Sequence, residues 1–393
     1  MLISAAAVVL SIAICQIFLG LALIALIASE ARLDFPPVKA PLCAFLGLTV
    51  TSWLLSGHLA AGLPQIRKFF VFSVLLVACT VFRDGRYTRW LAGAWFAAAA
   101  ASAIRSLGQF EQKVRAARSL HEDFYQFYVG ERITGFLSHW MTFSEVEMLI
   151  LLVLLSWLFF SPDLGRWRTV LGALCAAVLA ASLLASFTRS IWLATAVSSG
   201  YLTWHWRKRL LAAGPLLIAI MVVASPGAVK RRVQSMLSTR SDTSTSARII
   251  MWRTGWRMIE AHPLLGVGPE EVAPEFHNYV PADVTNLPPA FYGHLHNLYI
   301  HYAAERGVPA LLALLWLLAR ILRDHSRALR CARDEDRFVL YAVVAGVLGI
   351  LVGAMFEVNL GDSEVLTVFL TLISLGYAAI ARGKPAAAQS QSY

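Results

Sequence analysis

The chain has 393 residues, of which 58% are hydrophobic and only 15% are charged. A soluble domain carries about a quarter charged residues, so this composition excludes an ordinary soluble protein and indicates a polytopic membrane protein. The formal net charge of +10 suits anionic lipid head groups or phosphorylated ligands. Since no soluble basic domain carries that charge, we expect no nucleic-acid partner.

Apolar runs long enough, or nearly so, to cross about 30 Å of hydrocarbon recur along the whole chain. There are eleven of them, at residues 2–28, 38–60, 67–82, 88–104, 142–160, 167–187, 190–204, 209–225, 308–323, 338–356 and 365–381. The first run is longer than the apolar core of a signal peptide, so we interpret it as a retained span. The sequence predicts an all-α integral membrane protein with 11–12 transmembrane helices, the twelfth being a second span within the first 30 residues.

The connections between these runs differ in charge. Short, strongly basic connections lie at 83–89, 207–209 and 320–337, and the positive-inside rule assigns them to the cytoplasm. Counting spans from them places residues 105–141, 188–189, 226–307 and 357–364 on the opposite, outward face. We therefore predict an N-terminal transmembrane bundle (1–225) with an outward amphipathic segment (105–141), a large outward loop (226–307), C-terminal transmembrane helices (308–381) and a disordered cytoplasmic tail (382–393).

Arginines on the outward face run against this charge bias. Arg189 lies between two apolar runs, flanked by Thr188 and Ser190. A guanidinium there offers a planar fork of donors that fits phosphate oxygens. The alternative is an interfacial anchor whose charge snorkels to the membrane surface. Because long loops cross a membrane whatever their charge, the other outward arginines, Arg253 among them, also admit a purely topological explanation.

A second outward patch precedes the run at 142–160. Residues 109–128 mix lysine and arginine with aromatic side chains, which is typical of a helix lying on a membrane surface. Arg132 and His139 follow it directly. This patch is either part of a binding site or only a membrane anchor.

The large loop contains a Ser/Thr cluster at 243–246, which predicts the N-cap of a helix. We expect that helix to end at Pro263 and Gly266. Arg248, Trp252 and Trp256 recur along it at four-residue spacing and therefore share one face. Arg248 in the first turn, beside free backbone N–H groups, suits an anion. A structural helix in the membrane interface is the alternative.

The loop closes with the segment Gly293–Gly307, where we expect a helix from about His296 to Arg306 ending at Gly307. An imidazole with a pKa near its usual value of about 6.5 is well matched to taking a proton from a sugar hydroxyl. His294, His296 and His301 are candidates, although a lone histidine is often merely hydrogen-bonded. His301 and Glu305 have the spacing of helical metal ligands and would need a third ligand such as His277.

Common catalytic signatures are missing from the sequence. It contains no HExxH or CxxC pair, no Walker loop, no dinucleotide-binding glycine motif and no GxSxG elbow. We therefore predict neither a metal nor a cofactor, and a substrate that is already activated.

The order of these motifs resembles the O-antigen ligase and polymerase superfamily. The motifs are Arg132-x-x-Gly135, Thr188-Arg189-Ser190, Ser246-Ala247-Arg248 with Trp252, His262–Gly268, His294–Tyr299 with Glu305-x-Gly307, and Glu357–Asp362. The resemblance extends over most of the chain from residue 130 onward and is strongest at 246–310. It implies a metal-independent glycosyltransferase of the GT-C kind in the bacterial inner membrane, with a periplasmic active site. The implied donor is a glycan on undecaprenyl diphosphate, and in the ligase branch the acceptor is the lipid A core oligosaccharide.

The resemblance also implies roles for particular residues. The essential histidine falls on His296, and the diphosphate-binding arginines fall on Arg189 and Arg248. We further expect substrate contacts from a set of flanking residues: Arg132, His139, Trp252, Arg253, His294 and Tyr299. The alternatives are an O-antigen polymerase, a protein O-oligosaccharyltransferase, and a transporter of lipid-linked glycans. The apolar runs hold almost no charge at their centres, which disfavours the transporter.

Overall fold

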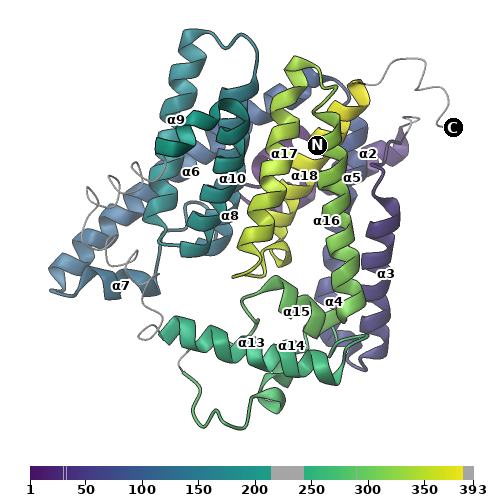
Figure 1. Cartoon of the computed structure of the whole chain (residues 1–393), viewed down its shortest axis with the longest axis vertical. Coiled ribbons are helices and arrows are strands. Elements are labelled where there is room, and N and C mark those ends of the chain that lie inside the picture. Colours follow the sequence, from purple (N-terminus) through teal and green to yellow (C-terminus); the bar gives the residue numbers. More distant parts are fainter. Residues whose placement is uncertain (30, 32, 214–242, 289, 384–393) are drawn as a thin grey trace.

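The computed structural model describes residues 1–393 except 30, 32, 214–242, 289 and 384–393. Every regular element in these described ranges is a helix, which confirms the all-α prediction (Figure 1). The span predicted at 209–225 and the predicted tail at 382–393 lie mostly outside the described residues.

The helices follow one another along the chain with short connections. Their bounds are α1 (Leu2–Ala7), α2 (Ile12–Ala28), α3 (Lys39–Leu55), α4 (Leu59–Arg67), η1 (Lys68–Phe72), α5 (Ser73–Val81), α6 (Gly85–Ser119), α7 (Phe124–Gly130), α8 (Trp140–Phe160), α9 (Arg166–Ala185), α10 (Arg189–Arg207), η2 (Lys208–Ala213), α13 (Thr243–Ala261), α14 (Val272–Glu275), η3 (Phe276–Tyr279), α15 (Leu298–Arg306), α16 (Val308–Ala328), α17 (Asp334–Gly353), η4 (Asn359–Gly361) and α18 (Ser363–Arg382).

Several of these helices are suited to a bilayer. Five helical stretches of the described chain are long and apolar enough to cross a membrane: Leu59–Val81, Trp140–Phe160, Arg166–Ala185, Asp334–Gly353 and Ser363–Arg382. The apolar helices α2 and α3 are shorter. The chain is therefore a multi-pass membrane protein, while the total of 11–12 spans stays a prediction.

The segment 105–141 differs from the expectation in its first part. The run at 88–104 does not end there but continues as α6, a single helix of 35 residues up to Ser119. No proline interrupts residues 85–119 and most are good helix formers, so nothing in the local sequence stops the helix. Only α7 forms a separate short helix in this segment.

The basic connections meet at one end of the bundle. Arg382 at the end of α18 donates hydrogen bonds to Asp336 (Nη2 to Oδ1, 2.5 Å) and to the carbonyl of Phe82 (3.0 Å). Arg89 lies 3.5 Å from Glu335. The connections at 83–89 and 320–337 therefore share one end, as the predicted topology requires.

The opposite end gathers the segments that were predicted to face outward. Lys68 donates to the carbonyl of Gly361 (3.0 Å), and Thr142 donates to Asp362 (2.6 Å). In Figure 1, α13, α14 and α15 lie beyond this end of the bundle, and α13 runs across the direction of the long helices. A small separate core holds them there, built around Met251, Met258, Phe276 and Leu295. Which side of the membrane this end faces stays a prediction.

Candidate functional site

The start of α15 is fixed to the end of α17. The N–H of Leu298 donates to the carbonyl of Ala354 (2.8 Å), and the side chain of Asn297 donates to the carbonyl of Met355 (3.0 Å). The same Asn297 side chain caps α15 by accepting from the N–H of Ile300 (3.1 Å). These bonds place the residues before α15 directly over the chain that follows α17.

His296 and Glu357 meet at this junction. The Nδ1 atom of His296 lies 3.1 Å from Oε2 of Glu357, and Nε2 of His294 lies 3.7 Å from the other carboxylate oxygen. Glu357 is buried, and 18% of the His296 side chain is exposed. His296 has a φ of +45°, a conformation that non-glycine residues seldom adopt and that costs roughly 1 kcal/mol or more. Such strain is retained where the surrounding contacts dictate the position of a side chain.

Arg248 approaches the same carboxylate from α13. Its Nη2 atom lies 3.9 Å from Oε2 of Glu357, which is a charge pair at long range and not a tight hydrogen bond. The helix that carries Arg248 packs closely on the histidine segment, because a Cβ atom at Gly255 would collide with the side chain of Leu295. Glycine at 255 thereby allows the guanidinium and the imidazoles to come together.

The charges around Glu357 determine its protonation. Burial alone would raise its pKa, but the hydrogen bond with His296 and the neighbouring His296, His294 and Arg248 together lower it below its usual value. Glu357 is therefore ionised at neutral pH. An ionised carboxylate favours the tautomer with hydrogen on Nδ1 of His296, and this tautomer has its lone pair on Nε2.

Burial, and then the adjacent His296, lower the pKa of His294 to about 4, so that His294 is a neutral imidazole.

Arg189 is the first residue of α10 and is half-buried. Its N-cap, Thr188, is buried and lies 3.2 Å (Oγ1 to Oγ) from Ser144 of α8. Two residues further on, the side chain of Ile191 packs beside Gly353, four residues before Glu357. These contacts place the start of α10 at the same end of the bundle as the His296–Glu357 pair.

Arg132 and His139 lie beside the start of α10 and α8. Arg132 donates to the carbonyl of Phe187 (3.5 Å), and its guanidinium stands 5.4 Å from the ring centre of Trp140. The His139 Nδ1 atom accepts the N–H of Met141 (3.3 Å) and so caps α8. Burial lowers the pKa of His139, partly offset by the charges of Asp362 and Glu357. Both residues lie at the same end of the bundle as the His296–Glu357 pair, and their role in substrate binding stays a prediction.

Three predicted substrate contacts have structural partners here. Arg253 forms two hydrogen bonds with the carboxylate of Asp283 (2.9 and 2.7 Å). The Tyr299 hydroxyl donates to the carbonyl of Leu351 (2.7 Å), and Trp252 packs against the small core. These contacts stabilise the loop and its junction with α17, and substrate binding by the three residues stays a prediction.

The turn at 262–268 supports the other end of α15. Val267 and Gly268 donate their N–H groups to the carbonyls of Ala304 (2.8 Å) and Glu305 (2.9 Å). Gly266 has a φ of +67°, and a Cβ atom there would collide with the backbone of Glu305. This close approach explains why the turn and the residue that ends α15 are both glycine.

A metal ion is chemically compatible with part of the site. Among the described residues, His294, His296 and Glu357 offer ligand atoms that lie within 4.8 Å of one another. Imidazole and carboxylate groups are the ligands that Zn²⁺ accepts. The charge of Arg248, 3.9 Å from the same carboxylate, works against a bound cation. His301 and Glu305, the pair considered from the sequence, lie 3.7 Å apart (Nε2 to Oε1). Glu305 also accepts hydrogen bonds from Arg306 (2.8 Å) and from the N–H of Glu270 (2.9 Å).

One protein family resembles part of this chain. Residues 174–315 match the family model described as O-antigen ligase (Wzy_C). This region of the chain is similar to the O-antigen ligase family. No curated protein matches the chain. The O-antigen ligase match contains Arg189, Arg248 and His296, and Glu357 lies beyond it. The sequence assigned Glu357 no role of its own, although the motif Glu357–Asp362 is among those that carry the resemblance.

Proposed function

We propose that this protein is an inverting, metal-independent glycosyltransferase that moves an O-antigen glycan from undecaprenyl diphosphate to a sugar hydroxyl of the lipid A core. The reaction takes place at the periplasmic face of the inner membrane. The observation that carries this proposal is the His296 imidazole, held 3.1 Å from an ionised Glu357 with Arg248 beside them, inside a superfamily of O-antigen ligases.

His296 acts as the general base in this reaction. With hydrogen on Nδ1 facing Glu357, Nε2 takes the proton of the acceptor hydroxyl while the oxygen attacks the anomeric carbon of the donor. The bond between that carbon and the diphosphate oxygen breaks, and the diphosphate leaves with the electron pair. A single displacement of this kind inverts the anomeric centre. Glu357 does not touch the substrate but orients the imidazole and stabilises the imidazolium that forms.

Arg248 and Arg189 bind the departing diphosphate. Guanidinium groups pair with phosphate oxygens through two parallel hydrogen bonds, which supplies the charge that Mg²⁺ provides in other enzymes. Arg248 lies near the Glu357 carboxylate at 3.9 Å without a tight bond to it. Further substrate contacts come from Arg132, His139, Trp252, Arg253, His294 and Tyr299.

A reconstituted transfer assay tests this function and its rivals. Purified protein in lipid nanodiscs receives undecaprenyl diphosphate-linked glycan with and without lipid A core, in the presence of EDTA. Transfer of the glycan to lipid A core, with no lengthening of the glycan on its carrier, supports the ligase. Lengthening of the glycan on its carrier without core would make the protein a polymerase, and transfer to a protein substrate would make it a protein O-oligosaccharyltransferase. A requirement for added metal would overturn the metal-independent mechanism, and the His296→Ala variant serves as the inactive control.

A further inference from the structure

His294 lies beside the His296–Glu357 pair without a hydrogen bond to it. Its Nε2 atom is 3.7 Å from Oε1 of Glu357, which is too long for a hydrogen bond. Its Nδ1 atom is buried and has no hydrogen-bond partner among the described residues. Since a buried polar group without a partner costs folding free energy, this imidazole is placed as a ligand-binding group is placed.

The three side chains converge at distances that suit one transition-metal ion. Bonds of about 2.0–2.2 Å at tetrahedral angles separate neighbouring zinc ligands by about 3.4 Å. The two contacts to Glu357, 3.1 Å from His296 Nδ1 and 3.7 Å from His294 Nε2, lie on either side of this value. All three ligand atoms lie within 4.8 Å of one another, and the two ring centres are 4.2 Å apart. A rotation of the His294 ring, which no printed hydrogen bond opposes, brings the imidazole nitrogens closer.

The ligand types select among metal ions. Two imidazole nitrogens and one carboxylate suit Zn²⁺, whereas Mg²⁺ and Ca²⁺ prefer oxygen ligands alone. The side chains of His294 and His296 are 31% and 18% exposed, which gives a metal ion access and leaves room for water as a fourth ligand. In the part of the chain that the structure describes, no other three such groups converge.

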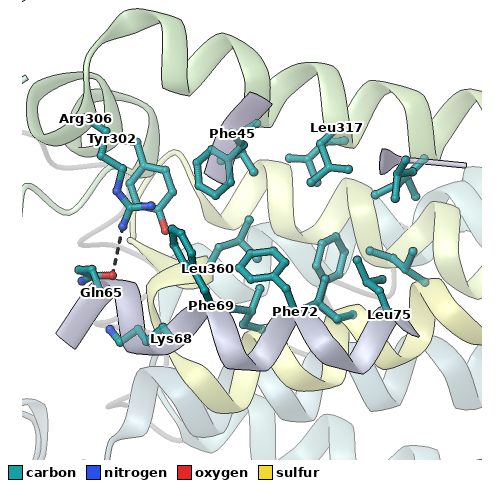
Figure 2. Close-up of a pocket in the computed structure, with 18 residues that line it drawn as sticks. Phe45, Gln65, Lys68, Phe69, Phe72, Leu75, Tyr302, Arg306, Leu317 and Leu360 are labelled. Carbon is teal, nitrogen blue, oxygen red and sulfur yellow. Dashed lines mark hydrogen bonds between the residues drawn. The ribbon is translucent and has the colours of Figure 1, made fainter. Parts of the chain in front are cut away.

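The hollow among α3, η1, α5, α16 and α18 offers no alternative site for such an ion (Figure 2). Its lining is mostly apolar, with Gln65, Lys68 and Arg306 at one end, and includes no histidine, cysteine or carboxylate among the described residues. The two cations at that end repel a metal ion. Zinc that binds this region of the protein should therefore bind at the histidines.

We propose that His294, His296 and Glu357 form a binding site for Zn²⁺, and that zinc bound there inhibits glycan transfer. The inhibition rests on the proposed function. Zinc takes the lone pair of Nδ1 of His296, so the hydrogen of this imidazole moves to Nε2. The Nε2 atom then has no lone pair for the proton of the acceptor hydroxyl. The imidazole stays neutral throughout, and no other reactant is needed.

Arg248 opposes the metal ion. Its Nη2 atom lies 3.9 Å from Oε2 of Glu357, so the guanidinium and zinc bring positive charge to the same carboxylate. The repulsion weakens zinc binding, and chelation should reverse the inhibition. It also gives the site a signature, because removal of the guanidinium should strengthen zinc binding while it weakens transfer.

The test measures zinc binding directly, with tag-free protein in phosphatidylcholine nanodiscs and a fluorescent chelator as competitor. His294→Asn should bind Zn²⁺ at least about tenfold more weakly than the wild type, because it removes one of three ligands. Arg248→Ala should bind Zn²⁺ at least about tenfold more tightly, a gain that misfolding does not produce. His277→Asn is the matched control, since His277 is an exposed histidine of the same loop, and its zinc affinity should be unchanged.

Transfer by the wild type is then followed as Zn²⁺ is added without EDTA. We expect transfer to fall at the zinc concentration that half-fills the site and to return when EDTA is added. Mg²⁺ at the same concentration should have no effect. If zinc fills the site and transfer is unchanged or increases, the inhibition is wrong.

The binding data separate this inference from the proposed function, because they need no transfer. Equal zinc affinities of the wild type and His294→Asn, or no gain in Arg248→Ala, would overturn the site while transfer in EDTA still supported the glycosyltransferase. The expected zinc affinities in a protein that transfers no glycan would leave the metal site standing and sink the proposed function.

Discussion

His296 and Glu357 are 61 residues apart in the chain, and their side chains lie 3.1 Å apart in the structure. The contact exists because Asn297 and Leu298 bind the carbonyls of Met355 and Ala354 at the end of α17. An imidazole held in this way presents one tautomer, and the ionised carboxylate stabilises its protonated form. The two residues should therefore act as a unit.

Replacement of Glu357 tests that unit. We expect Glu357→Gln to lower kcat by about 10²-fold, because the neutral amide no longer stabilises the imidazolium, with little change in KM for the donor. In a His296→Ala background the same replacement should cause almost no further loss. Steady-state kinetics of the single and double variants measure both effects. If the fold-losses in kcat of the two single variants multiply in the double variant, Glu357 acts independently of His296.

Arg248 should matter through its geometry as well as its charge. We expect Arg248→Ala to lower kcat by roughly 10²–10³-fold, the usual effect of removing a donor aimed at developing negative charge. Arg248→Lys should recover only part of this loss, since an ammonium group keeps the charge but not the planar fork. Arg86→Ala, at the basic end of the bundle, is the control and should transfer normally. Full recovery by lysine would argue against bidentate binding of the diphosphate.

Gly266 should be needed for the fold. Its φ of +67° and the collision of any Cβ atom with the Glu305 backbone predict that Gly266→Ala lowers the free energy of unfolding by more than about 1 kcal/mol. Thermal unfolding in detergent measures the change. Gly93→Ala in α6 is the matched control, because no atom lies within 4 Å of the added methyl group there. Equal midpoints for both variants would contradict the close packing of the 262–268 turn on α15.

The low pKa of His294 predicts a pH dependence of stability. In the unfolded chain its imidazole binds a proton below about pH 6.5, whereas in the folded protein it does so only near pH 4. Between these values the unfolded state binds more protons, so stability falls as the pH falls through this window. We expect His294→Asn to lose less thermal stability than the wild type between pH 6.5 and pH 4. Parallel curves for the two proteins would show that His294 is not the group responsible.

The orientation in the membrane can be tested with thiol labelling. Cys331 is exposed in the basic connection, and Phe291 is 68% exposed in the large loop. In a Cys43→Ser background, a membrane-impermeant maleimide added to spheroplasts should label the Phe291→Cys variant at residue 291 and leave Cys331 unmodified until the membrane is opened. Labelling of Cys331 alone in intact spheroplasts would place the His296–Glu357 pair on the cytoplasmic side and exclude the proposed reaction.

The sequence was a good guide to the local features of the site. The helix expected from about His296 to Arg306 is α15, and Gly307 ends it. The Ser/Thr cluster at 243–246 does begin a helix, α13, which carries Arg248. The expected surface helix at 109–128 was wrong over its first part, because hydrophobic patterning does not say where a helix stops when no proline or cap interrupts it.

The sequence by itself determined that this is a helical membrane protein, because hydrocarbon tolerates only long apolar segments whose backbone groups are bonded internally. The order of its short motifs also indicated a resemblance to the O-antigen ligase superfamily, and the family match over residues 174–315 agrees with it. Only the tertiary structure decided that Glu357 lies 3.1 Å from His296 and that Asp283 accepts hydrogen bonds from Arg253. Those pairings join residues far apart in the chain, and their partners are chosen by how α13, α15 and α17 pack, which no local pattern of residues encodes.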